Sequence, residues 1–300
     1  MGRTLFGSLP RWLKDPPPAF AFELSEAGIA WAEIARNPKI TFVPLERGVI
    51  SVSPLRDNIL RPEALQTQVR TLAAADGRHR RRRAALILPD YSVRVTVLDF
   101  DSFPSDASER LSLIRFRLKR TVPFDIESAA LSFQAQPDRS GSKRIDVAVA
   151  LAPQEIVNRY ESPFRAAGFH PGLVTTSLLA ALELVPGEGV KVLAKKTGRI
   201  LSLAVLVDGI LKLARTIEMD EASLEEVAGH LFPTLAYVED QLAARTDTIF
   251  ICGFGVESEQ TGGLLEAALG APVRVLFSRW GQPGEFDSGL FGFLETLKDS

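Results

Sequence analysis

The sequence predicts an α/β protein with two domains. Two successive stretches of the chain each contain a strand hairpin, then a helix, then a strand, which is the element order of an α/β domain. In the second stretch, Asp208-Gly209 lies between two apolar strands and is the dipeptide most typical of a tight β-hairpin. The chain has 300 residues, 46 % of them hydrophobic, which is ample for a core.

The first stretch follows the proline run Pro16–Pro18. Its strands are indicated by short apolar or alternating runs, and its helices by periodic apolar residues between a proline start and a glycine end. The expected strands are 20–24 (FAFEL), 28–34 (GIAWAEI), Ile40–Glu46 and Leu173-Val174, and the expected helices are Pro62–Ala75, Pro153–Ala167 and one that begins near Ser177.

The second stretch repeats this organisation. Pro233 is expected to kink or break its longer helix, because proline removes a helical hydrogen bond. The expected strands are Ile200–Val207, Ile210–Ile217, 248–251 and Pro272–Phe277, and the expected helices are Glu221–Ala244 and Leu264–Leu269.

Residues 86–133 carry the most specific pattern in the chain. A short apolar strand is stopped by a proline, an alternating strand and a charged helix follow, and a second proline ends that helix because it disfavours helical geometry in the residue before it. In order, these parts are Leu86–Leu88, Pro89-Asp90, the strand of Val93, Val95 and Val97, Asp106–Arg120, Val122-Pro123-Phe124, and a strand that begins with Leu131 and Phe133.

This succession resembles the inserted subdomain of the PilM family, the actin-like cytoplasmic proteins of type IV pilus assembly. The resemblance spans roughly residues 18–280. It implies an α/β, actin-like (duplicated RNase H-like) two-lobe fold with an inserted α/β subdomain in the first lobe. The implied division is an N-terminal tail at 1–17, a first lobe at 18–188 with its insert at about 84–152, a second lobe at 189–280, and a C-terminal tail or helix at 281–300.

The resemblance also implies a nucleotide cleft between the lobes. Actin-like proteins hold ATP and Mg²⁺ with two acidic, glycine-containing hairpins, in which glycine lets backbone N–H groups approach phosphates. The family's first hairpin reads approximately D-I-G-S-S-S-V-K. Here Glu23 stands for the aspartate, Ser25 for the glycine and Ala30 for the lysine, while Glu26 adds a negative charge where phosphates would lie.

The second hairpin departs further from the family pattern. Lysines stand near its acidic position, in 195–198 (KKTG), and a lysine cannot ligate Mg²⁺. The turn that contacts adenosine is kept in part as Gly253-Phe254-Gly255, where Phe254 is expected to fill the space of a base. The candidate cofactor-binding residues of this degenerate cleft are Glu23, Ser25, Thr197, Gly198, Gly253 and Gly255. We expect no catalytic residue, no metal and no ATP cofactor, with weak nucleotide binding without turnover, or ATPase activity, as the alternatives.

The function that the resemblance implies is a cytoplasmic scaffold of a type IV pilus assembly machine, peripheral to the inner membrane. Its expected partner is the N-terminal cytoplasmic tail of a PilN-like bitopic membrane protein, bound in a groove between the first lobe and the insert. Other pilus alignment and motor components would be reached through that contact. Two alternatives share the fold: the cytoplasmic L-type component of type II secretion, and an ATP-dependent kinase.

Composition excludes several other classes. The net charge of −2 gives no general attraction to nucleic acid, and the single cysteine, Cys252, rules out a disulfide framework. The basic run Arg78–Arg83 is expected to be a solvated loop, with contact to anionic lipid, an acidic partner or nucleic acid as alternatives. The apolar residues near both ends, Leu5–Leu13 and Phe286–Leu297, are expected to pack on the protein or a partner rather than to form interfacial helices.

Overall fold

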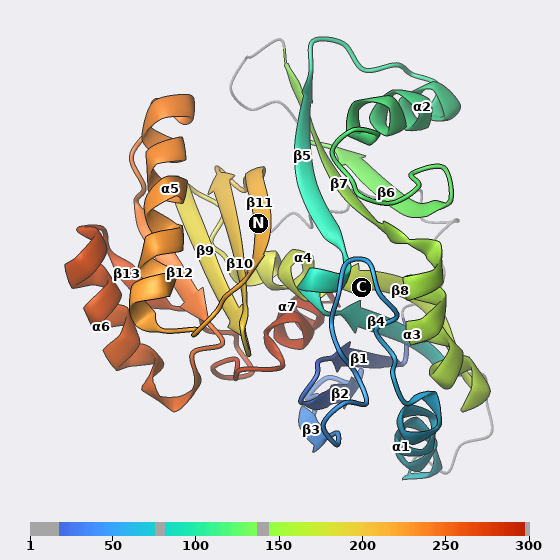
Figure 1. Ribbon diagram of the computed structural model, residues 1–300. Coiled ribbons are helices and arrows are strands. Elements are labelled where there is room, and N and C mark those ends of the chain that lie inside the picture. Colours follow the sequence, from blue (N-terminus) through green and yellow to red (C-terminus); the bar gives the residue numbers. More distant parts are fainter. Residues whose placement is uncertain (1–17, 76–81, 137–143, 298–300) are drawn as a thin grey trace.

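The computed structural model describes residues 18–75, 82–136 and 144–297, and it has two lobes with a smaller subdomain inserted in the first (Figure 1). Three β-sheets organise these parts, two of five strands and one of three. The N-terminal segment and Arg78–Arg81 of the basic run lie outside the described residues. The expectation of a loop is wrong for Arg82 and Arg83, because these two residues begin a strand of the first lobe.

The first lobe contains a mixed sheet of order β3-β2-β1-β4-β8, in which β4 and β8 run parallel to β1. An aromatic and aliphatic core on one face of the sheet is covered by two helices, and a C-terminal helix covers the other face. The elements are β1 (Phe20–Leu24), β2 (Gly28–Glu33), β3 (Thr41–Pro44), α1 (Pro62–Ala75), β4 (Arg82–Leu88), η1 (Asp90–Ser92), α3 (Gln154–Ala166), β8 (Phe169–Thr176) and α7 (Ser288–Thr296).

The second lobe repeats this plan with a sheet of order β11-β10-β9-β12-β13. Its strand β12 is parallel to both β9 and β13, and the lobe has its own core. The elements are β9 (Val190–Thr197), β10 (Ile200–Val207), β11 (Ile210–Glu218), α5 (Leu224–Leu242), β12 (Thr248–Cys252), η3 (Gly255–Glu257), α6 (Ser258–Leu269) and β13 (Val273–Val275). Two short helical segments, α4 (Ser177–Ala181) and η2 (Leu182–Leu184), join the lobes.

The inserted subdomain is an antiparallel sheet of order β5-β7-β6. One face packs on α2 through an apolar core, and the alanines of β7 lie on the other face. The elements are β5 (Arg94–Phe100), α2 (Ala107–Leu118), β6 (Ala129–Ala135) and β7 (Ile145–Pro153). Asp106 caps α2 by accepting hydrogen bonds from the backbone N–H groups of Ser108 and Glu109.

Most of the expected elements are confirmed within one to three residues, including the hairpin of β10 and β11 around Asp208-Gly209. Helix α5 is an exception, because it continues through Pro233. Interior proline costs a helix about 3 kcal/mol, but Leu231, Thr234 and Val238 are buried beside it and hold the helical path. Helix α6 also begins earlier than expected, at Ser258, because Gly262-Gly263 obscures its apolar period.

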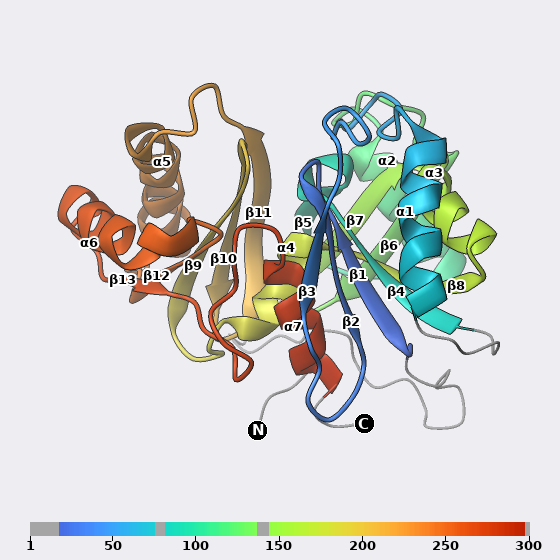
Figure 2. The same cartoon turned by 90° about the horizontal axis from the view of Figure 1, so that it is seen from below.

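The apolar C-terminal segment packs back on the protein, as expected. Helix α7 returns from the second lobe to the underside of the first-lobe sheet, where Figure 2 shows it beside α4. Leu290, Phe293 and Leu294 join a core with residues of β1, β2 and β4. An interfacial membrane role for this helix is therefore wrong, since its apolar side chains are already buried.

Candidate functional site

A group of buried polar side chains lies where the two lobes meet. We call it the interlobe cluster; it consists of Glu23, Asp90, Ser177, Lys195 and Ser202. Asp90 follows β4 and Glu23 lies in β1, both in the first lobe, whereas Lys195 and Ser202 come from the β9–β10 hairpin of the second lobe. Ser177 begins α4, between the lobes.

Asp90 is the centre of this cluster. The ammonium Nζ of Lys195 lies 3.0 Å from Asp90 Oδ2, and Ser202 Oγ donates a hydrogen bond of 2.7 Å to the same oxygen. The other carboxylate oxygen accepts a hydrogen bond of 2.6 Å from the backbone N–H of Leu178. Because the Asp90 side chain is 3 % exposed and that of Lys195 is 1 % exposed, this ion pair is shielded from solvent.

The electrostatics of the cluster favour a charged lysine. Burial lowers the pKa of Lys195, but the carboxyl groups of Asp90 and Glu23 more than offset it, and the net pKa is raised. Burial also raises the pKa of Glu23 to about 7, against the opposing effects of Lys195, Ser177 and the N–H of Leu290. The cluster therefore holds one firm ion pair beside a carboxyl group that titrates near neutral pH.

Glu23 also connects β1 to the C-terminal helix. Its carboxyl group accepts a hydrogen bond from the backbone N–H of Leu290, at 2.7 Å, in the first turn of α7, and another from the hydroxyl of Ser177. A carboxyl group at a helix N-terminus satisfies an N–H that has no partner within the helix. Glu23 thus acts in this structure as a buried link between β1, α4 and α7.

The six candidate residues of the cleft have different environments. Glu23 belongs to the interlobe cluster, and Thr197 adjoins it because its hydroxyl accepts a hydrogen bond of 2.8 Å from Lys195 Nζ. Ser25 is buried in the β1–β2 turn, where its hydroxyl and the backbone of Gly28 form mutual hydrogen bonds of 3.1 Å. Gly198 lies in the β9–β10 turn with a positive φ of 57°.

The two remaining candidates, Gly253 and Gly255, form the turn after β12 with positive φ values of 83° and 74°. A Cβ on Gly253 would lie 1.9 Å from the carbonyl oxygen of Lys196, so this close approach of two backbones requires glycine. Phe254, between them, is half-buried and packs against the core of the second lobe.

Several of these residues are committed to contacts within the protein. An ammonium group stands in the second-lobe hairpin beside Asp90, where a Mg²⁺ site would need oxygen ligands. Glu23 and Ser25 are already hydrogen-bonded within the protein, and the carboxylate of Glu26 accepts a hydrogen bond of 2.6 Å from the N–H of Val52. Among the described residues there is also no group of three or more histidine, cysteine or acidic side chains that could hold a metal ion.

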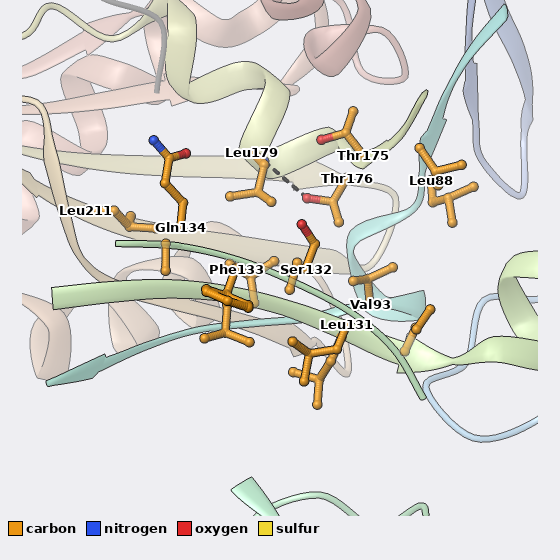
Figure 3. Close-up of a pocket in the computed structure, with 18 of the residues that line it drawn as sticks. Leu88, Val93, Leu131, Ser132, Phe133, Gln134, Thr175, Thr176, Leu179 and Leu211 are labelled. Carbon is orange, nitrogen blue, oxygen red and sulfur yellow. Dashed lines mark hydrogen bonds between the residues drawn. The ribbon is translucent and has the colours of Figure 1, made fainter. Parts of the chain in front are cut away.

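A second feature is a pocket of about 230 Å³ between the inserted subdomain and the first lobe. Its walls are β5, β6 and β7 of the insert on one side, and β8 with α4 on the other. Figure 3 shows Ser132 and Phe133 of β6 on one wall, and Thr176 and Leu179 on the opposite wall. No charged side chain is among the described residues that line this pocket.

The strand β6 gives the pocket a backbone edge. It is an outer strand of the three-stranded sheet, and within the described part of the chain its second edge pairs with no strand. Six residues of the pocket lining come from β6 and its immediate continuation: Ala130, Leu131, Ser132, Phe133, Gln134 and Gln136. A peptide in extended conformation could therefore find backbone partners as well as an apolar surface here.

The pocket also reaches the second lobe. The side-chain amide of Gln136 donates a hydrogen bond of 2.7 Å to the carbonyl of Leu211 and accepts one of 2.8 Å from its N–H. Both residues line the pocket. Close by, Lys212 Nζ lies 2.5 Å from Asp146 Oδ2, which joins β11 to β7. The insert is thus tied to both lobes at the pocket.

The sequence indicated only part of these two features. In the sequence, Asp90 belongs to a strand-ending Pro-Asp pair and Lys195 is a departure from the family pattern, but nothing in their local sequence predicts that they meet. Ser202 and Gln136 carry no local signal, and Ser177 is indicated only as the start of a helix. The alternation of small residues along β7, Ala148, Ala150 and Ala152, is the one pattern that could have indicated an open face.

Comparison with known proteins identifies the fold of this chain. No known protein family matches the sequence, and no curated protein matches it. Among solved structures, a chain of a PilM–PilN type IV pilus biogenesis complex is similar with a TM-score of 0.77 and 16 % identity, covering 93 % of this chain and 98 % of that one.

Two further structures are more distant. A Bacteroides thetaiotaomicron protein with an actin-like ATPase fold and unknown function has a TM-score of 0.55 at 12 % identity, covering 95 % of this chain and 99 % of that one. The cytoplasmic domain of EpsL, an inner-membrane component of the Vibrio cholerae type II secretion system, has a TM-score of 0.53 at 12 % identity, with 94 % and 95 % covered. The chain therefore has an actin-like two-lobe fold of the PilM type.

Proposed function

We propose that this chain is a cytoplasmic, actin-like scaffold protein of a type IV pilus assembly machine. In this proposal it lies against the inner membrane and binds the N-terminal cytoplasmic tail of a PilN-like bitopic protein. The similarity to a PilM chain over nearly the whole length of both proteins supports this context. An L-type component of type II secretion is the second candidate, supported by the similarity to the EpsL cytoplasmic domain.

The observation that carries the proposal is the pocket between the insert and the first lobe. Its lining is uncharged and mostly apolar, and one wall is the unpaired edge of β6. Val174, which is 37 % exposed, leaves apolar surface open to a partner on the opposite wall. These features suit a short extended peptide that adds backbone hydrogen bonds to β6 and places alternate apolar side chains in the pocket.

In this proposal the protein is a binding module and not an enzyme. The arrangement of Lys195, Glu23 and Ser25 supports a cleft that neither holds nor hydrolyses ATP, since each of these groups is committed to contacts within the protein. A kinase of the same superfamily would need phosphate-binding hairpins, which the interlobe cluster does not supply. No helix within the described ranges is long and apolar enough to span a membrane. In this proposal, contact with the membrane comes through the partner.

The test is a binding experiment with a blocked pocket. Labelled synthetic peptides that copy the N-terminal cytoplasmic tails of single-span inner-membrane proteins from the same organism serve as probes in fluorescence anisotropy. Ser132→Trp fills the pocket from the edge strand, because Ser132 is exposed and lines it. We expect a tail that binds the unchanged protein to lose at least about tenfold in affinity, or about 1.4 kcal/mol.

Ser112→Trp is the matched control. Ser112 is exposed on α2, which packs on the other face of the inserted sheet, so its replacement should leave tail affinity unchanged. Binding that survives Ser132→Trp would show that the pocket is not the docking site. If none of the tails binds the unchanged protein, the proposed partner class is wrong.

A further inference from the structure

We propose that the Asp90–Lys195 ion pair keeps the walls of the pocket between the insert and the first lobe in place without any nucleotide. Both residues would thereby position the pocket walls for the bound tail. This inference rests on the proposed function of the pocket. In this inference the interlobe cluster has a structural role in partner binding. It also assigns Lys195 the task that a bound magnesium nucleotide performs in an actin-like protein, which is to bridge the lobes.

Asp90 lies next to one wall of the pocket. Asp90 lies two residues after Leu88 and three before Val93, and both of these line the pocket. Its side chain therefore fixes the turn at which β4 passes into the wall formed by β5. A displacement of Asp90 would move that wall.

Asp90 also fixes the opposite wall. Through its Oδ1 it accepts the N–H of Leu178, at 2.6 Å, and the next residue, Leu179, lines the pocket together with Leu182. Through its Oδ2 it binds Lys195 and Ser202 of the second lobe. One carboxylate thus connects the insert wall, the α4 wall and the second lobe.

A second contact connects the insert to the second lobe at the far side of the pocket. There, the amide of Gln136 makes its pair of hydrogen bonds to the backbone of Leu211. The ion pair of Lys212 with Asp146 reinforces this contact, at 2.5 Å. With Asp90–Lys195 on one side and Gln136–Leu211 on the other, the width of the pocket depends on how the second lobe sits against the first.

Whether the two lobes are bridged by a nucleotide or by a side chain determines whether pocket geometry depends on ligand concentration. A nucleotide that bridges two lobes leaves them when its concentration falls, so the population of the closed form follows ligand concentration. Lys195 is covalently part of β9 and its charge is kept by Asp90 and Glu23. The pocket should therefore stay in one binding-competent state, and tail affinity should not respond to nucleotide.

The decisive experiment measures tail affinity and lobe separation in the same set of variants. In Lys195→Met combined with Asp90→Asn, both charges are removed together, because an unpaired buried Asp90 could prevent folding. Lys196→Met is the matched control: Lys196 is the next residue of β9, but its side chain is 18 % exposed and its ammonium lies 3.7 Å from Glu285, outside the interlobe cluster. Circular dichroism establishes that each variant is folded.

Tail affinity is measured by anisotropy with the best-binding peptide of the panel. Lobe separation is measured by double electron–electron resonance between spin labels on Arg70→Cys of α1 and Ala236→Cys of α5, which are both exposed. The native cysteine does not compete for label, because Cys252 is 1 % exposed and burial raises its pKa to about 11.

We expect the double variant to lose about tenfold in tail affinity and to show a broader distance distribution, since only a fraction of molecules then has the assembled pocket. The control variant should match the unchanged protein in both measurements, and added ATP and Mg²⁺ should change neither. A double variant with unchanged affinity and distances would overturn the inference while the proposed function stands.

A protein that binds no tail would instead refute the proposed function. The distance measurement would then still decide whether the ion pair holds the lobes together. Tail binding that requires ATP and Mg²⁺ in the unchanged protein would overturn the inference directly.

Discussion

At the scale of single residues, Glu23 is a buried carboxyl group with structural partners. The family resemblance predicts an acidic residue of a nucleotide cleft at this position, and in the structure its carboxyl group accepts hydrogen bonds from α7 and Ser177. The charged or titratable groups that act on it are Lys195 of β9 and Asp287 before α7, and it acts in turn on Cys252 of β12. Burial, with a smaller contribution from Asp287, outweighs Lys195 and the two hydrogen bonds and raises the pKa of Glu23 to about 7.

This raised pKa predicts a specific dependence of stability on pH. Between pH 4.5 and about 7 the folded protein keeps Glu23 protonated while the unfolded chain does not. The contribution of Glu23 to the free energy of unfolding is therefore complete at low pH and is lost as the pH rises through about 7. The loss is on the order of 3 kcal/mol, from the size of the shift. In Glu23→Gln the melting temperature should therefore fall less between pH 5 and pH 7.5 than in the unchanged protein.

Differential scanning fluorimetry of the two proteins over this pH range checks the prediction. Comparing the two proteins cancels the effects of the other carboxyl groups on stability. Asp57 is an example: Arg159 lowers its pKa, so its contribution to stability is lost as pH falls and not as pH rises. Parallel profiles would mean that Glu23 is ionised throughout.

At the scale of elements, the C-terminal helix α7 depends on small residues for its position. A Cβ on Gly292 would lie 2.0 Å from the carbonyl oxygen of Ala180 in α4, and one on Gly289 would lie 2.7 Å from the Cα of Ser177. The two helices can approach this closely only because α7 carries glycine at both contacts. This packing in turn brings the N–H of Leu290 to Glu23.

Gly292→Ala should accordingly destabilise the protein. Overpacking of this kind costs about 1–3 kcal/mol, which thermal or urea unfolding will detect. Gly263→Ala is the matched control, because Gly263 is an exposed helical glycine of α6 with nothing within 4 Å of an added Cβ. That variant should gain up to about 1 kcal/mol from helix propensity. Equal effects of the two substitutions would show that the α4–α7 contact does not constrain α7.

At the scale of the whole molecule, the buried Asp90–Lys195 ion pair connects the first lobe to the second. A ligand that binds the folded state at a hundred times its dissociation constant raises stability by about 2.7 kcal/mol. Since the residues of the interlobe cluster are occupied by one another, we expect ATP with Mg²⁺ to give no binding heat in calorimetry and no rise in melting temperature relative to Mg²⁺ alone. Measurable heat at high-micromolar ATP would return nucleotide control and kinase chemistry to consideration.

The sequence by itself determined many of the elements of this protein and their order, although it did not indicate the strands β7 and β9. Local periodicity and turn chemistry were enough for the Asp208-Gly209 hairpin, for α1 and for the alternating strand β5, because hydrogen bonds and side-chain spacing within a segment decide these features. The resemblance in residues 86–133 added the fold that these elements form, which the structural comparisons support. The turn glycines Gly253 and Gly255 were also identified, although as parts of a nucleotide cleft.

Only the tertiary structure decided what the polar residues do. Lys195 and Asp90 are 105 residues apart in the chain, and Glu23 and Leu290 are 267 apart, so no local pattern could have paired them. Whether a buried charge binds a ligand or another side chain depends on which partner the packing brings within about 3 Å, and that is settled by the docking of two lobes. The continuous path of α5 through Pro233 has the same origin, since its buried neighbours outweigh a local helix-breaking signal.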